Sequence, residues 1–330
     1  MAFIYGNKIK VSTFGQLHSD VAGAVIDGLP AGRKIDSEKL YQFLNRRVRG
    51  GTVRDRHDFS THSERPDEPE FLSGLVDGIT CGAPLCVTAQ NTDPLCIAGG
   101  ICAQLLEQAG IEIGAHIADI AGIADLPYDP VTVGAETLRT VRKAEFPVLS
   151  PQCAVVMREA IRVAQSEGDS LGGIIECAAV GVPAGLCGTI FGGAENKIAG
   201  IVFGIPNVCG IEFGNGFVST LLRGSSNNDE PYMDEDKIKM RSNNHGGILG
   251  GVTSGMPIIF RAAIKPPTQL VNLEQNGEKS AAAEISGAYR EDVKLHIPNT
   301  RHVTCMVSRA VPCIEAAAAI VIFDMLQDVN

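Results

Sequence analysis

The sequence predicts an α+β fold in which sheets and helices pack in layers. Strand-like segments rich in β-branched residues and bounded by glycine or proline occur at 172–185 and 251–264. Segments with apolar residues at i, i+3 and i+4, the pattern of a half-buried helix, are interspersed with them. No low-complexity linker interrupts the 330 residues. We therefore expect a single domain over residues 1–330, with strands from both halves of the chain sharing sheets.

Five segments are expected to be helical: Ser37–Leu44, Gly100–Gln108, Cys153–Glu167, Ala194–Phe203 and Pro312–Leu326. Asp36 or Ser37 is expected to cap the first, because short polar side chains accept bonds from the free amides of a first turn. Pro312 is expected to begin the last helix, where a missing N–H group does no harm.

The composition indicates an aliphatic core in an acidic protein. Aromatic residues make up 5% of the chain and tryptophan is absent, so Ala, Val, Ile and Leu must fill the core. The formal net charge of −10 argues against nucleic acid and anionic membranes as general partners. The longest apolar run, at 316–323, is too short to cross a bilayer, and the N-terminus shows no signal-peptide pattern.

The ten cysteines are scattered, without a C-x-x-C pair or a Cys/His spacing that suits zinc. Most lie in apolar runs, where a thiol behaves as a small hydrophobic group. We expect reduced cysteines in the core of a cytoplasmic protein, and no metal site.

A cluster of arginines stands out in this acidic chain. The stretch "NRRVRGGTVRDR" carries Arg46, Arg47, Arg49, Arg54 and Arg56 in what is expected to be a glycine-interrupted loop. The planar guanidinium group matches phosphate and carboxylate oxygens, which favours the binding of an anionic small molecule. The alternative is a solvated loop that pairs with its own acids, Asp55, Asp58 and Glu64.

Four further stretches have two interpretations each. "SNNHGGILGGVTSG" at 242–255 is either a loop with turns or a bare backbone surface for a flat or anionic ligand. Lys265, before two prolines, either meets a phosphate or is simply exposed. His18 either moves a proton near neutral pH or is structural. "GDSLGG" at 168–173 is expected to be a plain turn into a strand rather than a functional loop.

Taken in order, a long series of stretches resembles the chorismate synthase family. The stretches are "TFGQLHS", "VIDGLPAG", "NRRVRGG", "EPEFLSGLVDGITCGAPL", "NTD", "EGDSLGGIIECAAVGVPAGL", "GIEFGNGF", "SNNHGGILGGVTSGMPI", "KPPT" and "RHVTCMVSRAVPCIEAAAAIVIFDML". The resemblance implies a single-domain β-α-β sandwich, a homotetramer and reduced flavin mononucleotide (FMN) as cofactor. It also implies the anti-1,4-elimination of phosphate from 5-enolpyruvylshikimate-3-phosphate to give chorismate.

The resemblance also implies roles for individual residues. His18 is implied to be an acid that acts on the flavin, and Arg47 to bind the anionic substrate or a nicotinamide donor, NADPH. Arg54 is the candidate for a further family arginine in the same loop. The implied flavin contacts are Pro206, Asn207, Gly250, Lys265, Thr268 and Arg301.

The sequence departs from the family pattern, and three of the departures affect catalytic groups. After Asp93 it runs directly into Pro94, where the family has a segment with R-P-G-H-A-D and a second catalytic histidine. The F-G-E-S-H-G motif reads "FGQLHS" around His18. The family's Asp in G-R-H-D-P-C, believed to support removal of the substrate proton, is Val303 here.

Three interpretations follow from these departures. The chain is a chorismate synthase whose sequence as given omits a segment, or a non-catalytic or engineered relative that keeps the scaffold and weak flavin binding. The third, independent of the resemblance, is an anion-binding protein built on the arginine cluster. If the 330 residues are complete, we expect very low turnover or none.

Overall fold

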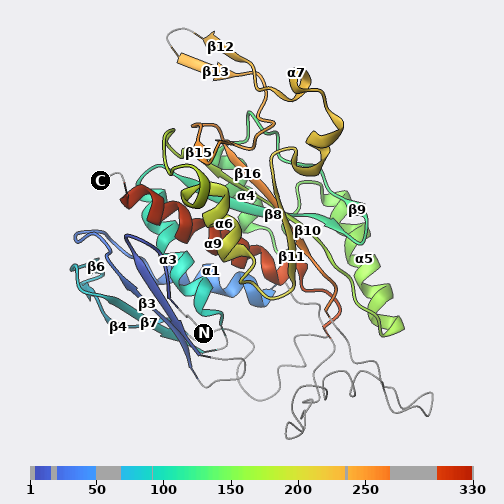
Figure 1. Cartoon of the computed structure of the whole chain (residues 1–330). Helices are drawn as coiled ribbons and strands as arrows, with labels where there is room; N and C mark the ends of the chain where they lie inside the picture. Colours follow the sequence, from blue (N-terminus) through green and yellow to red (C-terminus); the bar gives the residue numbers. More distant parts are fainter. Residues whose placement is uncertain are drawn as a thin grey trace, which may run out of the picture.

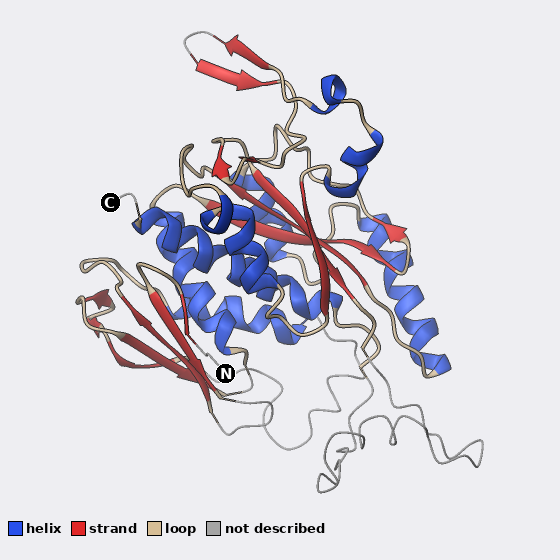
Figure 2. Ribbon diagram, in the orientation of Figure 1, coloured by secondary structure: helices blue, strands red, loops and turns tan. Residues whose placement is uncertain are grey.

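Two five-stranded antiparallel sheets enclose a layer of helices in the computed structural model of the chain (Figure 1, Figure 2). The structure describes residues 4–15, 21–49, 68–90, 92–234, 237–267 and 303–328. The predicted α+β class and β-α-β sandwich are confirmed by this layering. One contiguous hydrophobic core joins both sheets and the helices between them.

The first sheet comes entirely from the N-terminal part of the chain. Its strand order is β1 (Ile4–Tyr5), β2 (Lys10–Phe14), β3 (Ala22–Asp27), β7 (Leu85–Ala89) and β4 (Glu70–Ser73). Burial alternates along β7, where Leu85, Val87 and Ala89 face the core. The short hairpin of β5 (Leu75–Val76) and β6 (Ile79–Thr80) lies outside the sheet order.

The second sheet combines strands from before and after the middle of the chain, as predicted. Its order is β11 (Val208–Phe213), β16 (Ile258–Ile264), β10 (Gly173–Val180), β8 (Glu112–Ile120) and β9 (Ile123–Ala124). The predicted strand over 251–264 is wrong in its first half. Residues there form a small hairpin of β14 (Ile248–Leu249) and β15 (Val252–Thr253) instead.

The helix α9 (Val307–Gln327) lies in the centre of the sandwich. It packs against α1 (Ser37–Arg49), α3 (Pro94–Gln108) and α6 (Ala194–Val202), and against β8 and β10 of the second sheet. By length and composition α9 could span a membrane, but 89% of its apolar window is buried inside the protein. It is a core helix.

The remaining elements lie outside the central layer. Helix α4 (Ala135–Lys143) packs against β8, and α5 (Pro151–Glu167) against β9. A projecting arm holds η2 (Gly216–Leu221), α7 (Gly224–Asn227), β12 (Pro231–Asp234) and β13 (Lys237–Met240) (Figure 1). The short η1 (Ile190–Gly192) precedes α6 and packs against it.

Two helix boundaries differ from the predictions. Helix α1 begins as expected, with the Lys39 amide donating to Asp36 Oδ1 at 3.1 Å, but it continues to Arg49. Helix α9 begins at Val307, so the prediction that Pro312 starts it is wrong. Pro312 removes one amide donor in the second turn, and burial on all sides outweighs that loss.

The cysteines follow the prediction only in part. All ten are free thiols, and five are buried: Cys96, Cys102, Cys177, Cys305 and Cys313. Cys81 and Cys209 are exposed, which contradicts the expected core position for these two.

Candidate functional site

Three of the predicted flavin contacts meet at one end of the second sheet. The Lys265 amide donates to the Asn207 carbonyl at 2.9 Å, because the start of β11 pairs with the end of β16. Asn207 adopts a positive φ of 69° in the turn that follows Pro206. The Lys265 side chain is exposed at this end. The structure therefore brings Pro206, Asn207 and Lys265 together.

The "GDSLGG" stretch fastens this end of the sheet to the start of α9. Ser170 Oγ donates to the Pro267 carbonyl at 2.9 Å, and the Leu171 amide donates to the Thr304 carbonyl at 2.7 Å. A hollow of about 360 Å³ beside these contacts is lined in part by Ser170 and Leu171. The stretch does more than the plain turn that the sequence predicted, and it places Val303 next to the Lys265 end.

Arg47 lies in the last turn of α1, beside the start of α3 and the second turn of α9. Its Nη2 is 3.5 Å from Asp93 Oδ2, and its Nε is buried without a partner among the described residues. Asp93 also caps α3 by accepting from the Leu95 amide. Burial by itself disfavours the charged guanidinium, but the nearby Cys313 thiol and the Asp93 carboxylate hold the pKa of Arg47 above its ordinary value. Arg47 is a fixed cation with one unused donor.

Helix α9 connects the Arg47 cluster with the Lys265 cluster. Thr304 and Cys305, just before α9, contact Leu171, while Cys313 in its second turn lies 3.5 Å from Cys96 Sγ in α3. The two clusters are thus separated by only the first turns of one helix.

Gly250 lies in the β14–β15 hairpin, at the opposite end of β16 from Lys265. Seven residues of strand separate the two ends, about 20 Å. Gly250 is exposed at a φ of 61° with nothing within 4 Å of an added Cβ. At Gly246, by contrast, an added Cβ would lie 2.4 Å from the Gly214 nitrogen. Close packing inside the fold explains Gly246, whereas Gly250 presents open backbone within this stretch.

Arg46 does not belong to an anion-binding loop, which corrects the sequence interpretation. It lies inside α1, and both of its Nη atoms bond the buried Glu315 carboxylate, Nη2 to Oε1 at 2.9 Å. The Ala115 amide donates to the same carboxylate at 2.8 Å. Four other predicted site residues lie outside the described part of the chain: His18, Arg54, Thr268 and Arg301.

A charged row crosses the outer face of the second sheet and was not predicted. His116 is fully buried, with Nδ1 3.2 Å from Asp125 Oδ2 and Nε2 3.0 Å from Glu176 Oε2. Burial by itself lowers the pKa of His116, but the two carboxylates outweigh it and raise the pKa. Glu176 in β10 lies opposite Arg261 in β16, and Arg261 forms an ion pair with Glu212 opposite it in β11. Only pairing between distant strands assembles this row, so sequence spacing gives no signal for it.

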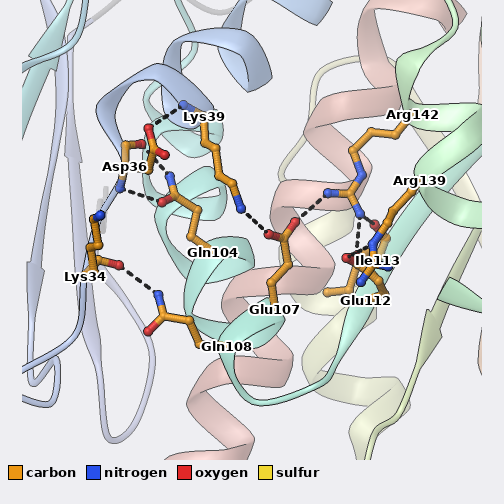
Figure 3. Close-up of polar contacts among 10 residues, drawn as sticks. All are labelled: Lys34, Asp36, Lys39, Gln104, Glu107, Gln108, Glu112, Ile113, Arg139 and Arg142. Atoms are coloured by element: carbon orange, nitrogen blue, oxygen red, sulfur yellow. Dashed lines mark hydrogen bonds and ion pairs between the residues drawn. The ribbon is translucent and has the colours of Figure 1, made fainter. Parts of the chain in front are cut away.

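A cavity of about 990 Å³ lies between α1, α3, α4 and α9. Among the described residues, Arg46 of the arginine cluster lines it, and the predicted ligand contacts Arg47, Pro206, Asn207, Gly250 and Lys265 do not. Figure 3 shows the chain of charges that crosses it, from Lys39 through Glu107 and Arg142 to Glu112.

Comparison with known proteins decides the family. The family model described as chorismate synthase matches residues 9–95 and 89–327. The chain belongs to the chorismate synthase family. Chorismate synthase of Lancefieldella parvula is 33% identical over 381 aligned positions, covering 99% of this chain and 96% of the relative. That of Synechocystis sp. is 31% identical, covering 99% and 97%.

A solved structure supports the fold of the chorismate synthase family. A crystal structure of chorismate synthase superposes with a TM-score of 0.77, covering 98% of this chain and 93% of the other. At 24% identity this likeness is an argument for the fold alone.

The break between the two matched segments falls at residues 89–95. Here β7 ends at Ala89 and α3 begins at Pro94, so the chain passes almost directly from strand to helix. The alignment of 381 positions is also longer than the 330-residue chain, so the relative has residues without a counterpart here. The break coincides with the place where the sequence lacks the R-P-G-H-A-D segment.

Proposed function

We propose that this chain catalyses the chorismate synthase reaction, a carbon–oxygen lyase reaction that eliminates phosphate from 5-enolpyruvylshikimate-3-phosphate. Family membership over residues 9–327 carries the proposal. Arg47 and Lys265 support it as two cations of the described chain, since both substrate and flavin phosphate are anions. We propose residues 1–330 as a single functional domain.

The residues at the Lys265 end fit a reduced FMN cofactor. Lys265 is exposed and has no ion-pair partner in the described part of the chain, so its ammonium group is available to a phosphate. Pro206 and Asn207 beside it form a turn against which a ring system can lie. We propose that Thr268 and Arg301 complete this site, with His18 as the acid. Bound reduced FMN would supply an electron that is returned as phosphate leaves.

Arg47 is proposed to hold the anionic substrate or NADPH, with Arg54 as its partner. The buried, unbonded Nε of Arg47 gives it a donor to offer. Gly250 lies at the far end of β16, so it reaches a flavin at Lys265 only if a second copy of the chain contributes it.

We propose low turnover for a chain of this length, because two proton-handling groups are absent. Val303 can neither accept nor relay a proton, and no histidine follows Asp93 in the β7–α3 connection. Losing one positioned acid or base costs about 10²–10⁴-fold. The second candidate function, a flavin-binding scaffold without turnover, is favoured by the same observation.

The deciding assay supplies reduced FMN anaerobically with 5-enolpyruvylshikimate-3-phosphate and follows chorismate. Flavin binding is measured in parallel by fluorescence. We expect Lys265→Ala to weaken flavin binding by about tenfold or more, and Lys10→Ala, another exposed lysine, to leave it unchanged. Flavin binding without chorismate identifies the scaffold. Normal turnover by a chain confirmed at 330 residues contradicts the predicted loss.

We propose a homotetramer in the cytoplasm. Large apolar side chains are exposed in η2, where Leu221 is 83% exposed and Phe217 80%, and in η1, where Phe191 is 92% exposed. Exposed apolar groups of this size indicate a protein contact, and a second copy of the chain is the proposed partner. Sedimentation of only monomer at micromolar concentration would contradict it.

A further inference from the structure

The cavity between α1, α3, α4 and α9 has a cationic end. Arg139, Arg142 and Lys143 line it from the second half of α4. Phe43, Val311 and Pro312 add apolar surface to the lining from α1 and α9. At about 990 Å³ the cavity is large enough for a metabolite-sized ligand.

The acids near this end already have partners. Glu107 accepts from Lys39 Nζ at 3.0 Å and from Arg142 Nη1 at 2.9 Å (Figure 3). Glu112 accepts from Arg139 Nε and Arg142 Nη2, both at 2.8 Å. Burial by itself raises the pKa of Glu107, but Lys39 and Arg142 outweigh it and lower the pKa. Glu145 is engaged as well.

The hydrogen-bonding groups without a partner at this end, within the described ranges, are N–H donors of basic side chains. Arg142 Nε is buried without a partner among the described residues. Among the described residues, Arg139 bonds Glu112 through its Nε. Both of its Nη atoms are therefore left for another acceptor. Lys143 is exposed and forms no ion pair within the described ranges. The three acids at this end, Glu107, Glu112 and Glu145, balance the three cations in charge but are already engaged, so the free hydrogen-bonding groups are the donors of Arg139 and Lys143.

We propose that the α4 end of this cavity is a binding site for a small multivalent oxyanion, a polycarboxylate or a polyphosphate. The Nη atoms of Arg139 and the ammonium of Lys143 would bind its oxygens, because a guanidinium fork and an ammonium group both match such acceptors. The site is separate from the proposed substrate site, since neither Arg47 nor Lys265 lines the cavity.

Binding at this site can affect α1 through two hydrogen bonds. Arg142 bonds Glu107, and Glu107 bonds Lys39 in the first turns of α1. An oxyanion that draws Arg142 towards itself competes with Glu107 for the guanidinium. We therefore expect binding to change the hydrogen exchange of amides in the first turns of α1 as well as in α4.

The test is isothermal titration of the full chain with citrate and, separately, with inorganic pyrophosphate; the stronger of the two identifies carboxylate or phosphate chemistry. Arg139→Ala and Lys143→Ala should each weaken binding by about tenfold or more. Arg139→Lys should retain part of the affinity. Arg162→Ala, an exposed arginine of α5 in an i,i+3 pair, is the matched control and should bind as the unmodified chain does.

Circular dichroism establishes that each variant is folded, and Arg139 is 58% exposed, so its replacement should not unfold the chain. Equal affinity in Arg139→Ala and Arg162→Ala overturns the proposal. Loss of binding in Arg47→Ala alone, or no saturable binding of either anion, overturns it too. These outcomes do not depend on chorismate formation, so they stand apart from the proposed catalytic function.

Discussion

Helix α9 is held by two kinds of contact, and its neighbouring residues Glu315 and Ala316 show the difference. Ala316 lies against Gly99 of α3 so closely that an added Cβ on Gly99 would lie 2.2 Å from the Ala316 Cβ. Glu315 faces the other way, to Arg46 of α1 and the free edge of β8 at Ala115. One contact depends on shape and the other on charge.

The charged contacts have a structural reason. Strand β8 has an unpaired edge beyond its short pairing with β9, and its backbone groups need partners there. Glu315 accepts from the Ala115 amide, and Arg142 Nη2 donates to the Ile113 carbonyl at 2.8 Å. The α3–α9 contact has no such requirement, because helices satisfy their own backbone. Small residues there allow close approach and dense packing instead.

The largest effect is expected for Glu315→Ala. It leaves the Arg46 guanidinium buried without a partner and frees the Ala115 amide, a loss of about 3–5 kcal/mol in the free energy of unfolding. Denaturant unfolding measures it. The double variant with Arg46→Met removes the unpaired charge and should recover part of the loss. No recovery would mean that charge is not the reason for the effect.

Gly99→Ala should cost about 1–3 kcal/mol through overpacking against Ala316, although alanine is the better helix former. Gly200→Ala in α6 is the control, because an added Cβ there meets nothing within 4 Å. We expect it to stabilise the protein by up to about 1 kcal/mol. Thermal unfolding of both variants shows whether each substitution lowers or raises the stability. A change in stability of the same sign for both would contradict a tight α3–α9 contact.

The buried ion pairs of His116 should make the stability of the protein depend on pH. Its pKa in the folded protein is raised above the ordinary value of about 6.5, so folding favours the charged imidazolium. Its contribution to stability is therefore complete below pH 6.5 and is lost as pH rises through the raised pKa. The difference in unfolding free energy between the unmodified chain and His116→Gln should shrink on this rise. A difference that grows with pH would contradict the assignment.

The smallest effect is expected for Arg139→Ala. Its ion pair with Glu112 is 58% exposed on the arginine side, and exposed pairs contribute about 0–1 kcal/mol. Chemical denaturation with and without 0.5 M salt separates this pair from the buried Glu315 contact, because salt screens only the exposed one. If Arg139→Ala lowered the free energy of unfolding as much as Glu315→Ala, the exposed and the buried ion pair would not differ in their contribution to stability.

The sequence by itself determined the features that depend on neighbouring residues. Asp36 caps α1 and apolar spacing marks the helices, because capping and amphipathic burial act within one or two turns. The ordered motifs also indicated the chorismate synthase family, which the comparisons show.

Tertiary structure alone decided the partners of the polar and small residues. Arg46 was expected in an anion-binding loop, but Glu315, 269 positions away, turns it into a structural ion pair. Gly246 lies in the stretch read either as a loop with turns or as a ligand surface, and the Gly214 backbone fills the space beside it. Gly250 and Lys265 were expected at one site, and the length of β16 separates them. In each case the deciding contact lies far along the chain or depends on how a strand is placed, which local spacing does not encode.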